Sequence, residues 1–222
     1  MKKALVTGAN RGIGLELVKQ LKARGDDVIA CARSRSPELD ALGVSVQIVD
    51  VRDAKSVRAL KVTGPLDLVF NVAGVNGGPR QSIAQMAEDL EMRDVLETFD
   101  VNAVGPLRIA VALRPHLRSG SKLVHVTSGM GSITDNTSGG AYAYRMSKAA
   151  LNMASRSLAV DLKGDGIVSV VINPGWVQTD MGGKSATTPV DESVRGILRE
   201  VDRATLADSG EFLNWKGNRY AF

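Results

Sequence analysis

Residues 4–14 have the sequence ALVTGANRGIG, in which a short apolar run is followed by glycines at the spacing G-x-x-x-G-x-G. The apolar run predicts a buried strand over residues 3–7, and the periodicity after the glycines predicts a helix over 12–24. Glycines between a strand and a helix let the backbone approach a pyrophosphate, to which the first N–H groups of the helix are free to donate. The spacing differs from the common dinucleotide fingerprint G-x-G-x-x-G, so a turn without a ligand is an alternative interpretation.

The alternation of short apolar runs with longer amphipathic segments continues through the rest of the sequence. We expect strands at residues 3–7, 27–32, 45–49, 66–70, 122–127, 168–172 and 211–214, and helices at 12–24, 37–42, 54–61, 87–117, 143–162 and 191–203. The first six strands are rich in Val, Leu and Ile without strict alternation, which is typical of strands buried on both faces. Alternating strands and helices require crossovers, and therefore predict an α/β fold of the Rossmann-type, doubly wound class. We expect a seven-stranded, mostly parallel sheet with helices on both faces, in one domain over residues 1–222.

The composition is that of an ordinary globular protein, with 28 Lys and Arg against 24 Asp and Glu and a formal net charge of +4. No block of like charges indicates binding to nucleic acid or to an anionic membrane, and no apolar run is long enough to span a bilayer. The apolar run after Lys2 and Lys3 is too short for a secretion signal, so the cytoplasm is the expected location. Cys31 is the single cysteine. It fits a reducing compartment, and we expect it to be a buried apolar residue rather than a reactive thiol.

Tyr144 and Lys148 lie four residues apart in the predicted helix 143–162, so their side chains share one face. A phenol has a pKa near ~10, and an adjacent ammonium favours the phenolate and lowers that pKa. A positioned tyrosine beside a lysine can therefore act as a general acid or base. A surface tyrosine with a solvated lysine is the alternative. Tyr142 is a competing acid, but Met146 stands where its lysine partner would be.

Three further motifs follow predicted strands, at the sheet edge where doubly wound folds bind ligands. Residues 127–129 (Thr-Ser-Gly) end the fifth strand, and a serine hydroxyl there can donate to a substrate carbonyl oxygen, although serine is also common in turns. Residues 71–74 (Asn-Val-Ala-Gly) end the fourth strand, and residues 173–181 (NPGWVQTDM) follow the sixth. Small residues in these motifs let a flat ring lie against the backbone, and Thr179 can bond a carboxamide.

Together, and in this order, these motifs resemble those of the short-chain dehydrogenases/reductases. The shared marks are TGxxxGxG, an N-N-A-G-like motif, a strand-end serine, Y-x-x-x-K and a P-G motif, and the resemblance covers nearly the whole chain. Residues 143–152 and 174–181 are most similar to the C-factor and carbonyl-reductase-like branch. The resemblance implies an NAD(P)-dependent oxidoreductase that moves a hydride between the nicotinamide and a carbonyl or alcohol carbon.

The resemblance also implies roles for individual residues. Tyr144 matches the catalytic acid/base, Lys148 matches the lysine that lowers the tyrosine pKa and bonds the nicotinamide ribose, and Ser128 matches the hydroxyl that polarises the substrate. Asn102 matches an asparagine that anchors a proton-relay water, and Asp50 matches the carboxylate that bonds the adenine amino group. The implied cofactor-binding set is Gly8, Asn10, Arg11, Gly12, Ile13, Gly14, Arg33, Asp50, Val51, Asn71, Ala73, Gly74, Tyr144, Lys148, Pro174, Gly175, Val177 and Thr179. No metal is expected.

Three departures from the family pattern affect details of the fold. Val72 replaces the second asparagine of N-N-A-G. Ser128 and Tyr144 are sixteen positions apart, which is longer than usual, so the intervening loop must bulge. The segment between Asp53 and Pro65 is short, which shortens one helix and leaves the chemistry untouched.

Arg33 follows the second strand, where relatives specific for NAD place an acidic residue to accept from the ribose 2′-OH. A guanidinium there can instead grip a 2′-phosphate through two parallel hydrogen bonds. Arg11 would approach the same phosphate from the glycine loop. The sequence therefore predicts a preference for NADP(H) over NAD(H). The alternative is that Arg33 and Arg35 are solvated loop charges that only stack on adenine.

Two function hypotheses follow. The first is an active carbonyl reductase with a small-molecule carbonyl or alcohol substrate, in a pocket lined from residues 129–140, Trp176 and residues 182–188. The second is a C-factor-like signalling or regulatory protein that binds NAD(P) with little turnover. The full catalytic set favours the first.

His116 and His125 are not placed for catalysis. The small and apolar residues of helices 87–117 and 143–162 predict a homodimer or homotetramer, as the resemblance implies.

Overall fold

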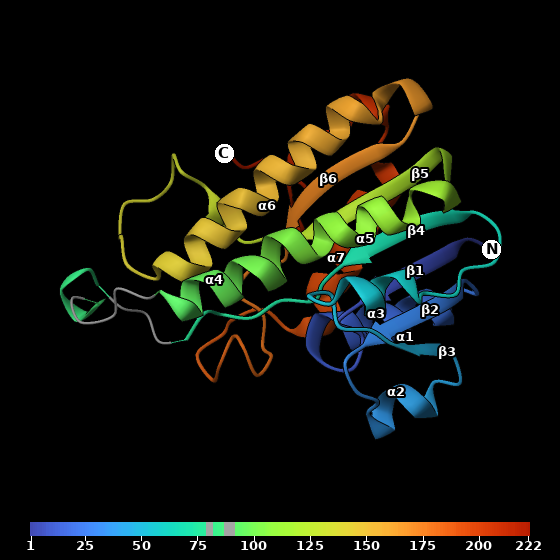
Figure 1. Ribbon diagram of the computed structural model, residues 1–222, viewed down its shortest axis with the longest axis horizontal. Helices are drawn as coiled ribbons and strands as arrows, with labels where there is room; N and C mark the ends of the chain where they lie inside the picture. Colours follow the sequence, from blue (N-terminus) through green and yellow to red (C-terminus); the bar gives the residue numbers. More distant parts are fainter. Residues whose placement is uncertain (79–81, 87–91) are drawn as a thin grey trace.

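The computed structural model describes residues 1–78, 82–86 and 92–222. A seven-stranded sheet has the order β3-β2-β1-β4-β5-β6-β7, and every pair of neighbouring strands is parallel (Figure 1). The strands are β1 Lys3–Thr7, β2 Asp27–Ala32, β3 Ser45–Ile48, β4 Leu66–Asn71, β5 Leu117–Val126, β6 Val168–Asn173 and β7 Phe212–Asn214. The predicted doubly wound, seven-stranded sheet is confirmed, and its named strands are all parallel rather than mostly so.

The connections between the strands are largely helical. The α-helices of the described residues are α1 Gly12–Ala23, α2 Pro37–Ala41, α3 Ala54–Arg58, α4 Arg93–Phe99, α5 Gly105–Leu113, α6 Tyr142–Asp161 and α7 Val190–Arg203. Shorter turns are η1 Ala84–Met86, the π-helical η2 Asp100–Val104, η3 Arg114–His116, η4 Gly129–Gly131, η5 Lys163–Asp165 and η6 Leu206–Asp208. Most predicted bounds agree with these to within a few residues. As expected from the short segment after Asp53, α3 is brief.

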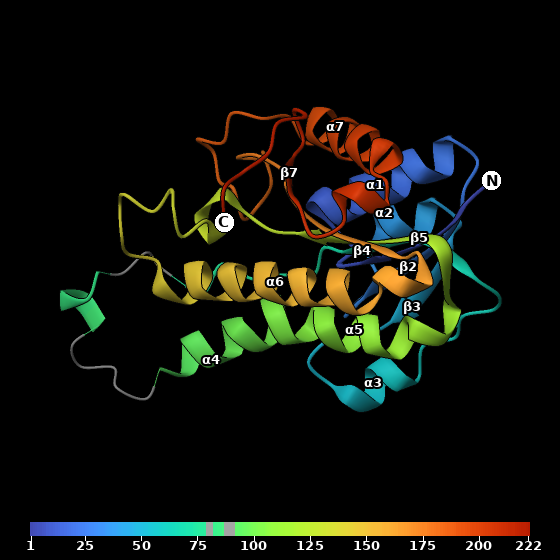
Figure 2. The same cartoon turned by 90° about the horizontal axis from the view of Figure 1, so that it is seen from above.

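Helices cover both faces of the sheet, because successive strand residues point to opposite sides. Val6 packs in one core with Leu17 of α1 and Ile197 of α7. Its neighbour Leu5 packs in a second core with Ile109 of α5. Figure 2 shows the same division, with α1 and α7 on one side of the sheet and α3, α5 and α6 on the other. The near-continuous apolar runs of the strands are thereby buried on both faces.

The prediction of one continuous helix over residues 87–117 is wrong. Residues 87–91 lie outside the described part of the chain, and α4 begins at Arg93. At η2 the N–H of Gly105 donates to the carbonyl of Asp100, a π-type bond, and Pro106 has no N–H to continue the ladder. The helix α5 ends before Pro115, and β5 begins at Leu117 rather than at residue 122. Across the described residues, no helix is both long enough and apolar enough to cross a membrane.

Candidate active site

The strand order reverses between β1 and β4, and the carboxyl ends of parallel strands leave a crevice at such a point. A cleft of about 1330 Å³ lies there, lined by residues that follow the strands β1 to β6. Its volume exceeds the roughly 300–1,000 Å³ of ordinary small-molecule pockets. The cleft therefore has room for an extended ligand together with a second, smaller molecule.

The glycine loop forms one wall of the cleft. Gly8 has φ +67°, and a Cβ there would lie 2.8 Å from the backbone of Ala73. A Cβ on Gly14 would lie 2.1 Å from the carbonyl oxygen of Gly8, so only glycine fits. The helix α1 begins at Gly12 with no side-chain cap and no acidic residue in its first turn. Its free N–H groups and positive dipole end suit a pyrophosphate, so this backbone cradle fits the expected dinucleotide.

Arg33 follows β2 directly and lines the cleft. Its side chain is exposed and, among the described residues, makes no hydrogen bond or ion pair. Arg35 is paired with Asp40 at 2.8 Å, and Arg11 is paired with Asp180 at 3.2 Å through side chains that are 65% and 81% exposed. Exposed pairs of this kind are weak. The Arg33 side chain is therefore available to bind an anion in the cleft. Arg11 could bind the same anion with little loss of free energy from its exposed ion pair.

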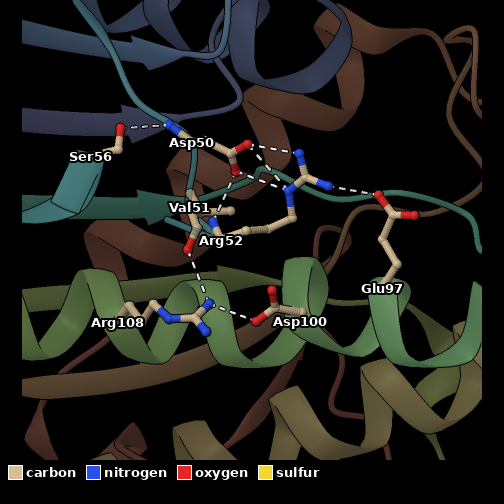
Figure 3. A network of polar contacts seen from close by, with 7 residues as sticks. All are labelled: Asp50, Val51, Arg52, Ser56, Glu97, Asp100 and Arg108. Atoms are coloured by element: carbon tan, nitrogen blue, oxygen red, sulfur yellow. Dashed lines mark hydrogen bonds and ion pairs between the residues drawn. The ribbon is translucent and has the colours of Figure 1, made fainter. Parts of the chain in front are cut away.

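Asp50 follows β3 and lines the cleft, but its carboxylate already has a partner within the chain (Figure 3). Arg52 donates to it from Nη2 at 2.8 Å and from Nε at 3.2 Å. The hydrogen bond from Arg52 holds the pKa of Asp50 below its usual range. Arg52 also donates to Glu97 of α4 at 2.7 Å. The carboxylate is thus kept ionised and fixed in orientation by a residue that sequence reasoning missed, although it stands only two positions away.

Figure 3 also shows how the backbone beside Asp50 is held. The carbonyl oxygen of Val51 accepts from Nη1 of Arg108 at 3.3 Å. The same Nη1 donates to Asp100 at 2.7 Å. Because Arg108 belongs to α5 and Asp100 to η2, these contacts tie the strand-end loop to the helices beneath it. Val51 lines the cleft next to Asp50.

Tyr144 and Lys148 enter the other end of the cleft from α6. The Lys148 Nζ atom lies 5.6 Å from the centre of the Tyr144 ring and donates to the carbonyl oxygen of Val126 at 2.8 Å. Burial lowers the pKa of Lys148 to about 8. Burial also raises the pKa of Tyr144, against a smaller lowering by its hydrogen bond with Ser128. The sequence predicts a lowered tyrosine pKa, but in the chain alone burial outweighs the neighbouring groups.

Ser128 is brought to Tyr144 by the turn that follows β5. Its Oγ atom accepts from the N–H of Met130 at 3.1 Å, and a hydrogen bond links its side chain to Tyr144. Thr127 donates to Asn152 of α6 at 2.7 Å, which fixes the strand end against that helix. The residues between Ser128 and Tyr144 loop outward before α6, as their long spacing predicts (Figure 1).

Asn71 and Asn102 do not line the cleft, unlike the other predicted site residues. Asn102 is fully buried in η2, where its Oδ1 accepts from the Val75 N–H and its Nδ2 donates to the Val75 carbonyl, both at 2.8 Å. Asn71 is buried against His125, with its Nδ2 3.2 Å from the His125 Nδ1. Asn102 thereby supports the backbone around the cleft, whereas Asn71 contacts the His125 side chain. The residues that do line it are Gly8, Asn10, Arg11, Gly12, Ile13, Gly14, Arg33, Asp50, Val51, Ala73, Gly74, Ser128, Tyr144, Lys148, Pro174, Gly175, Val177 and Thr179.

The substrate end of the cleft differs from its predicted outline. Met130, Trp176 and Met181 line it, as expected. Residues 132–140 and 183–188, which are described by the structure, do not line the cleft, although the sequence predicts that both segments line it. Tyr220, from the segment after β7, lines the cleft instead, and no motif in the sequence marks it. Only the tertiary fold brings that distant segment to the site.

The remaining candidates agree with their predicted structural roles. His116 is half-buried and His125 is buried, and neither lines the cleft. Burial lowers the pKa of His125 to about 4, with a smaller contribution from the Lys148 charge. Cys31 is buried, and burial raises the pKa of its thiol to about 12. A thiol with that pKa is unreactive at neutral pH.

A family model described as short chain dehydrogenase matches residues 2–189. The chain belongs to the short-chain dehydrogenase family. This short-chain dehydrogenase is 51% identical to C-signal of Myxococcus xanthus over 157 residues, which are 70% of the chain and 92% of that protein. It is 39% identical to 1-hydroxy-2-glutathionyl-2-methyl-3-butene dehydrogenase of Rhodococcus sp. (strain AD45), over 98% of each protein.

Among solved structures, the short-chain dehydrogenase is similar to NADPH-bound carbonyl reductase from chicken fatty liver. The two share 33% identity and a TM-score of 0.89, over 100% of this chain and 99% of that one. The predicted family and its C-factor and carbonyl-reductase-like branch are therefore confirmed. So is the prediction that the protein is an NAD(P)-dependent oxidoreductase.

Proposed function

We propose that this short-chain dehydrogenase is an NADP-dependent carbonyl reductase that acts on a small-molecule carbonyl or alcohol. The observation that carries the proposal is the convergence of Ser128, Tyr144 and Lys148 at one end of a long cleft. The glycine loop and Arg33 lie along the rest of that cleft. A nicotinamide cofactor supplies the hydride, and the protein supplies orientation and a proton.

In reduction, a bound nicotinamide would supply the hydride for the carbonyl carbon, and Tyr144 would give its phenolic proton to the oxygen. The pKa of Tyr144 is raised by burial, so the phenol stays protonated at neutral pH and is ready to donate. The Ser128 hydroxyl stabilises the negative charge that develops on the oxygen. Lys148, with its pKa near 8, exchanges protons close to neutral pH and lies beside the ring that must regain one.

The residues proposed to bind the cofactor extend along the cleft from the end that holds Ser128, Tyr144 and Lys148. The N-terminus of α1 would hold the pyrophosphate, while Pro174, Gly175 and Thr179 would hold the nicotinamide. Asp50, held by Arg52, accepts from the adenine amino group. Arg33 binds the 2′-phosphate, which gives a preference for NADP(H) over NAD(H). Its position in the cleft lining, without a hydrogen bond or ion pair to the described residues, supports this assignment.

A C-factor-like signalling role with little turnover is the second candidate. The 51% identity to C-signal over 157 residues favours it. The intact set of Ser128, Tyr144 and Lys148 favours catalysis, because a protein that only signals has no need to retain it. A steady-state rate with any carbonyl compound separates the two.

We further propose that residues 1–222 act as one domain, in the cytoplasm, as a homodimer or homotetramer. The single, buried Cys31 supports a reducing compartment. Exposed apolar side chains on the outer faces of α4, α5 and α6 support the assembly. They are Leu96, Leu107, Val111, Met153 and Val160.

Replacing Tyr144 by Phe tests the proposed function. Removing general acid catalysis costs typically ~10²–10⁴-fold, so Tyr144→Phe should lose turnover by that factor. The affinity for NADPH, measured by its fluorescence, should stay within a few fold. Tyr142→Phe is the matched control, because Tyr142 lies on the same helix and does not line the cleft. Tyr144→Phe with a near wild-type rate would exclude Tyr144 as the acid, and a wild-type protein that reduces no carbonyl would favour the signalling role.

A further inference from the structure

The segment after β7 turns back toward the cleft. The N–H of Asn214 donates to the carbonyl of Asn218, and Leu213 pairs with Arg219 in an antiparallel bridge. The N–H of Tyr220 then donates to the carbonyl of Phe212 at 2.8 Å. These bonds run the segment alongside β7 in the opposite direction. Because β7 pairs with the last three residues of β6, the segment stays near the carboxyl edge of the sheet, where the cleft lies.

The same segment is fastened to the loop that precedes α6. The carbonyl oxygen of Phe222 accepts from the N–H groups of Ile133 at 2.9 Å and Thr134 at 3.0 Å. The Phe222 ring lies 5.6 Å from that of Phe212, which is fully buried. The segment is therefore held on both sides of Tyr220, and the position of that residue is set by the fold.

Tyr220 itself reaches the substrate end of the cleft. Its ring stacks on Phe212 with centroids 5.0 Å apart, and it lines the cleft. A Cβ on Gly129 would lie 3.5 Å from Cε1 and Oη of Tyr220, so the ring edge lies over the residue directly after Ser128. A molecule with its carbonyl oxygen at Ser128 and Tyr144 would have its substituents close to this ring.

Three further side chains at this end are apolar or aromatic. Met130, Trp176 and Met181 line it, and Trp176 is 54% exposed. The indole N–H of Trp176 donates to the carbonyl of Gly182 at 2.9 Å, which fixes the orientation of its ring. Two aromatic rings with fixed orientations favour flat apolar groups, since aromatic contacts depend on ring geometry as well as on buried area.

We propose that Tyr220 is a specificity-determining residue, which binds the substituent of the substrate and favours planar, uncharged aromatic carbonyl compounds over short aliphatic ones. The proposal rests on the proposed function. The aromatic preference should be roughly tenfold, the size expected for one well-placed ring contact plus the apolar area it buries. Because Tyr220 lies on a different element from the proton donor, its loss should change substrate selection and leave cofactor binding unchanged.

The test compares benzaldehyde with butanal as substrates for the wild type, Tyr220→Leu, Tyr220→Met and Tyr220→Phe. Methionine fills much of the space on Phe212 without a ring, so it serves if the leucine variant folds poorly. We expect the Leu and Met variants to raise KM for benzaldehyde roughly tenfold and to leave KM for butanal within about twofold. Tyr220→Phe should behave as wild type, and so should the control Tyr142→Leu. An unchanged ratio of the two KM values in the Leu and Met variants would overturn the proposal.

Binding of acetophenone to the NADP⁺ complex, measured by calorimetry, adds a readout that needs no turnover. We expect Tyr220→Leu and Tyr220→Met to weaken it by a similar factor. If the wild type reduces no carbonyl but binds acetophenone through Tyr220, the proposed function fails and the role of Tyr220 stands. If carbonyls are reduced and the variants change neither the KM ratio nor acetophenone affinity, the function stands and the role of Tyr220 fails. A wild type that neither reduces carbonyls nor binds acetophenone overturns both.

Discussion

At the scale of single residues, Arg33 should decide which cofactor is used. A carboxylate at its position would repel a 2′-phosphate, whereas the guanidinium can form charge-assisted bonds to it. We expect the wild type to favour NADPH over NADH by at least about tenfold in kcat/KM, the size of one or two such bonds at an exposed site. Arg33→Asp should erase or reverse that ratio.

Arg35→Asp is the matched control for this prediction. It makes the same change in charge two residues away, but Arg35 is already paired with Asp40. Its effect on the cofactor ratio should therefore be much smaller. Equal use of NADH and NADPH by the wild type would contradict the role of Arg33.

The buried imidazole of His125 should make the fold sensitive to acid. Burial lowers its pKa from 6.5 to about 4, so between these values the unfolded chain binds a proton that the native chain does not. Stability therefore falls as the pH drops from 6.5 toward 4, by about 3 kcal/mol in all, and the loss levels off below the folded pKa.

His125→Gln should reduce that loss, because an amide can still bond Asn71 and Ser169 but does not titrate. Urea denaturation across the interval from pH 6.5 to about 4 measures the effect. His116→Gln is the control, since His116 is only half-buried and lies outside the core. A mutant whose stability falls with pH as steeply as that of the wild type would show that His125 is not the responsible group.

At the scale of elements, the sequence predicts best where one local signal dominates. The strands β1, β4 and β6 are apolar on both faces and were located to within a residue at each end. The break at η2 could not be predicted, because the apolar periodicity of a helix continues across it and a π-type bond leaves no sequence signature. The first half of β5 was missed because Ser121 and its polar neighbours resemble a loop, whereas in the fold the Ser121 hydroxyl donates to the carbonyl of Leu66.

In the candidate site, too, the sequence predicts local patterns better than contacts between distant segments. The glycine loop and the pair Tyr144 and Lys148 are local patterns, and the structure brings both to one cleft. Arg52 and Tyr220 reach that cleft through contacts with Asp50 and Phe212 that no spacing predicts. The pKa of Tyr144 could not be predicted either, because helical spacing indicates the nearby lysine but not the burial that outweighs it.

At the scale of the whole molecule, the outer faces of α5 and α6 carry more apolar surface than a monomer needs to expose. The two helices lie side by side on one face of the sheet (Figure 2). Val111 on α5 is 66% exposed, and Met153 on α6 is 67% exposed. Large apolar side chains exposed on neighbouring helices are typical of interfaces between subunits.

We therefore predict that this face pairs with a second copy of the chain around a two-fold axis, the commonest closed symmetry. In such a contact each side chain near the axis meets the same region of its partner, so one new charge is buried in both subunits. Met153→Glu should weaken association by at least about tenfold, since an unpaired charge is costly to bury. Ile133→Glu is the control, because Ile133 is exposed on the loop before α6 and belongs to neither helix. Light scattering at micromolar concentration should return a multiple of the 23.5 kDa chain for the wild type and the control, with a shift toward the monomer for Met153→Glu. A wild-type protein that scatters as a monomer, or a Met153→Glu variant that stays assembled, would show that this face is not the interface.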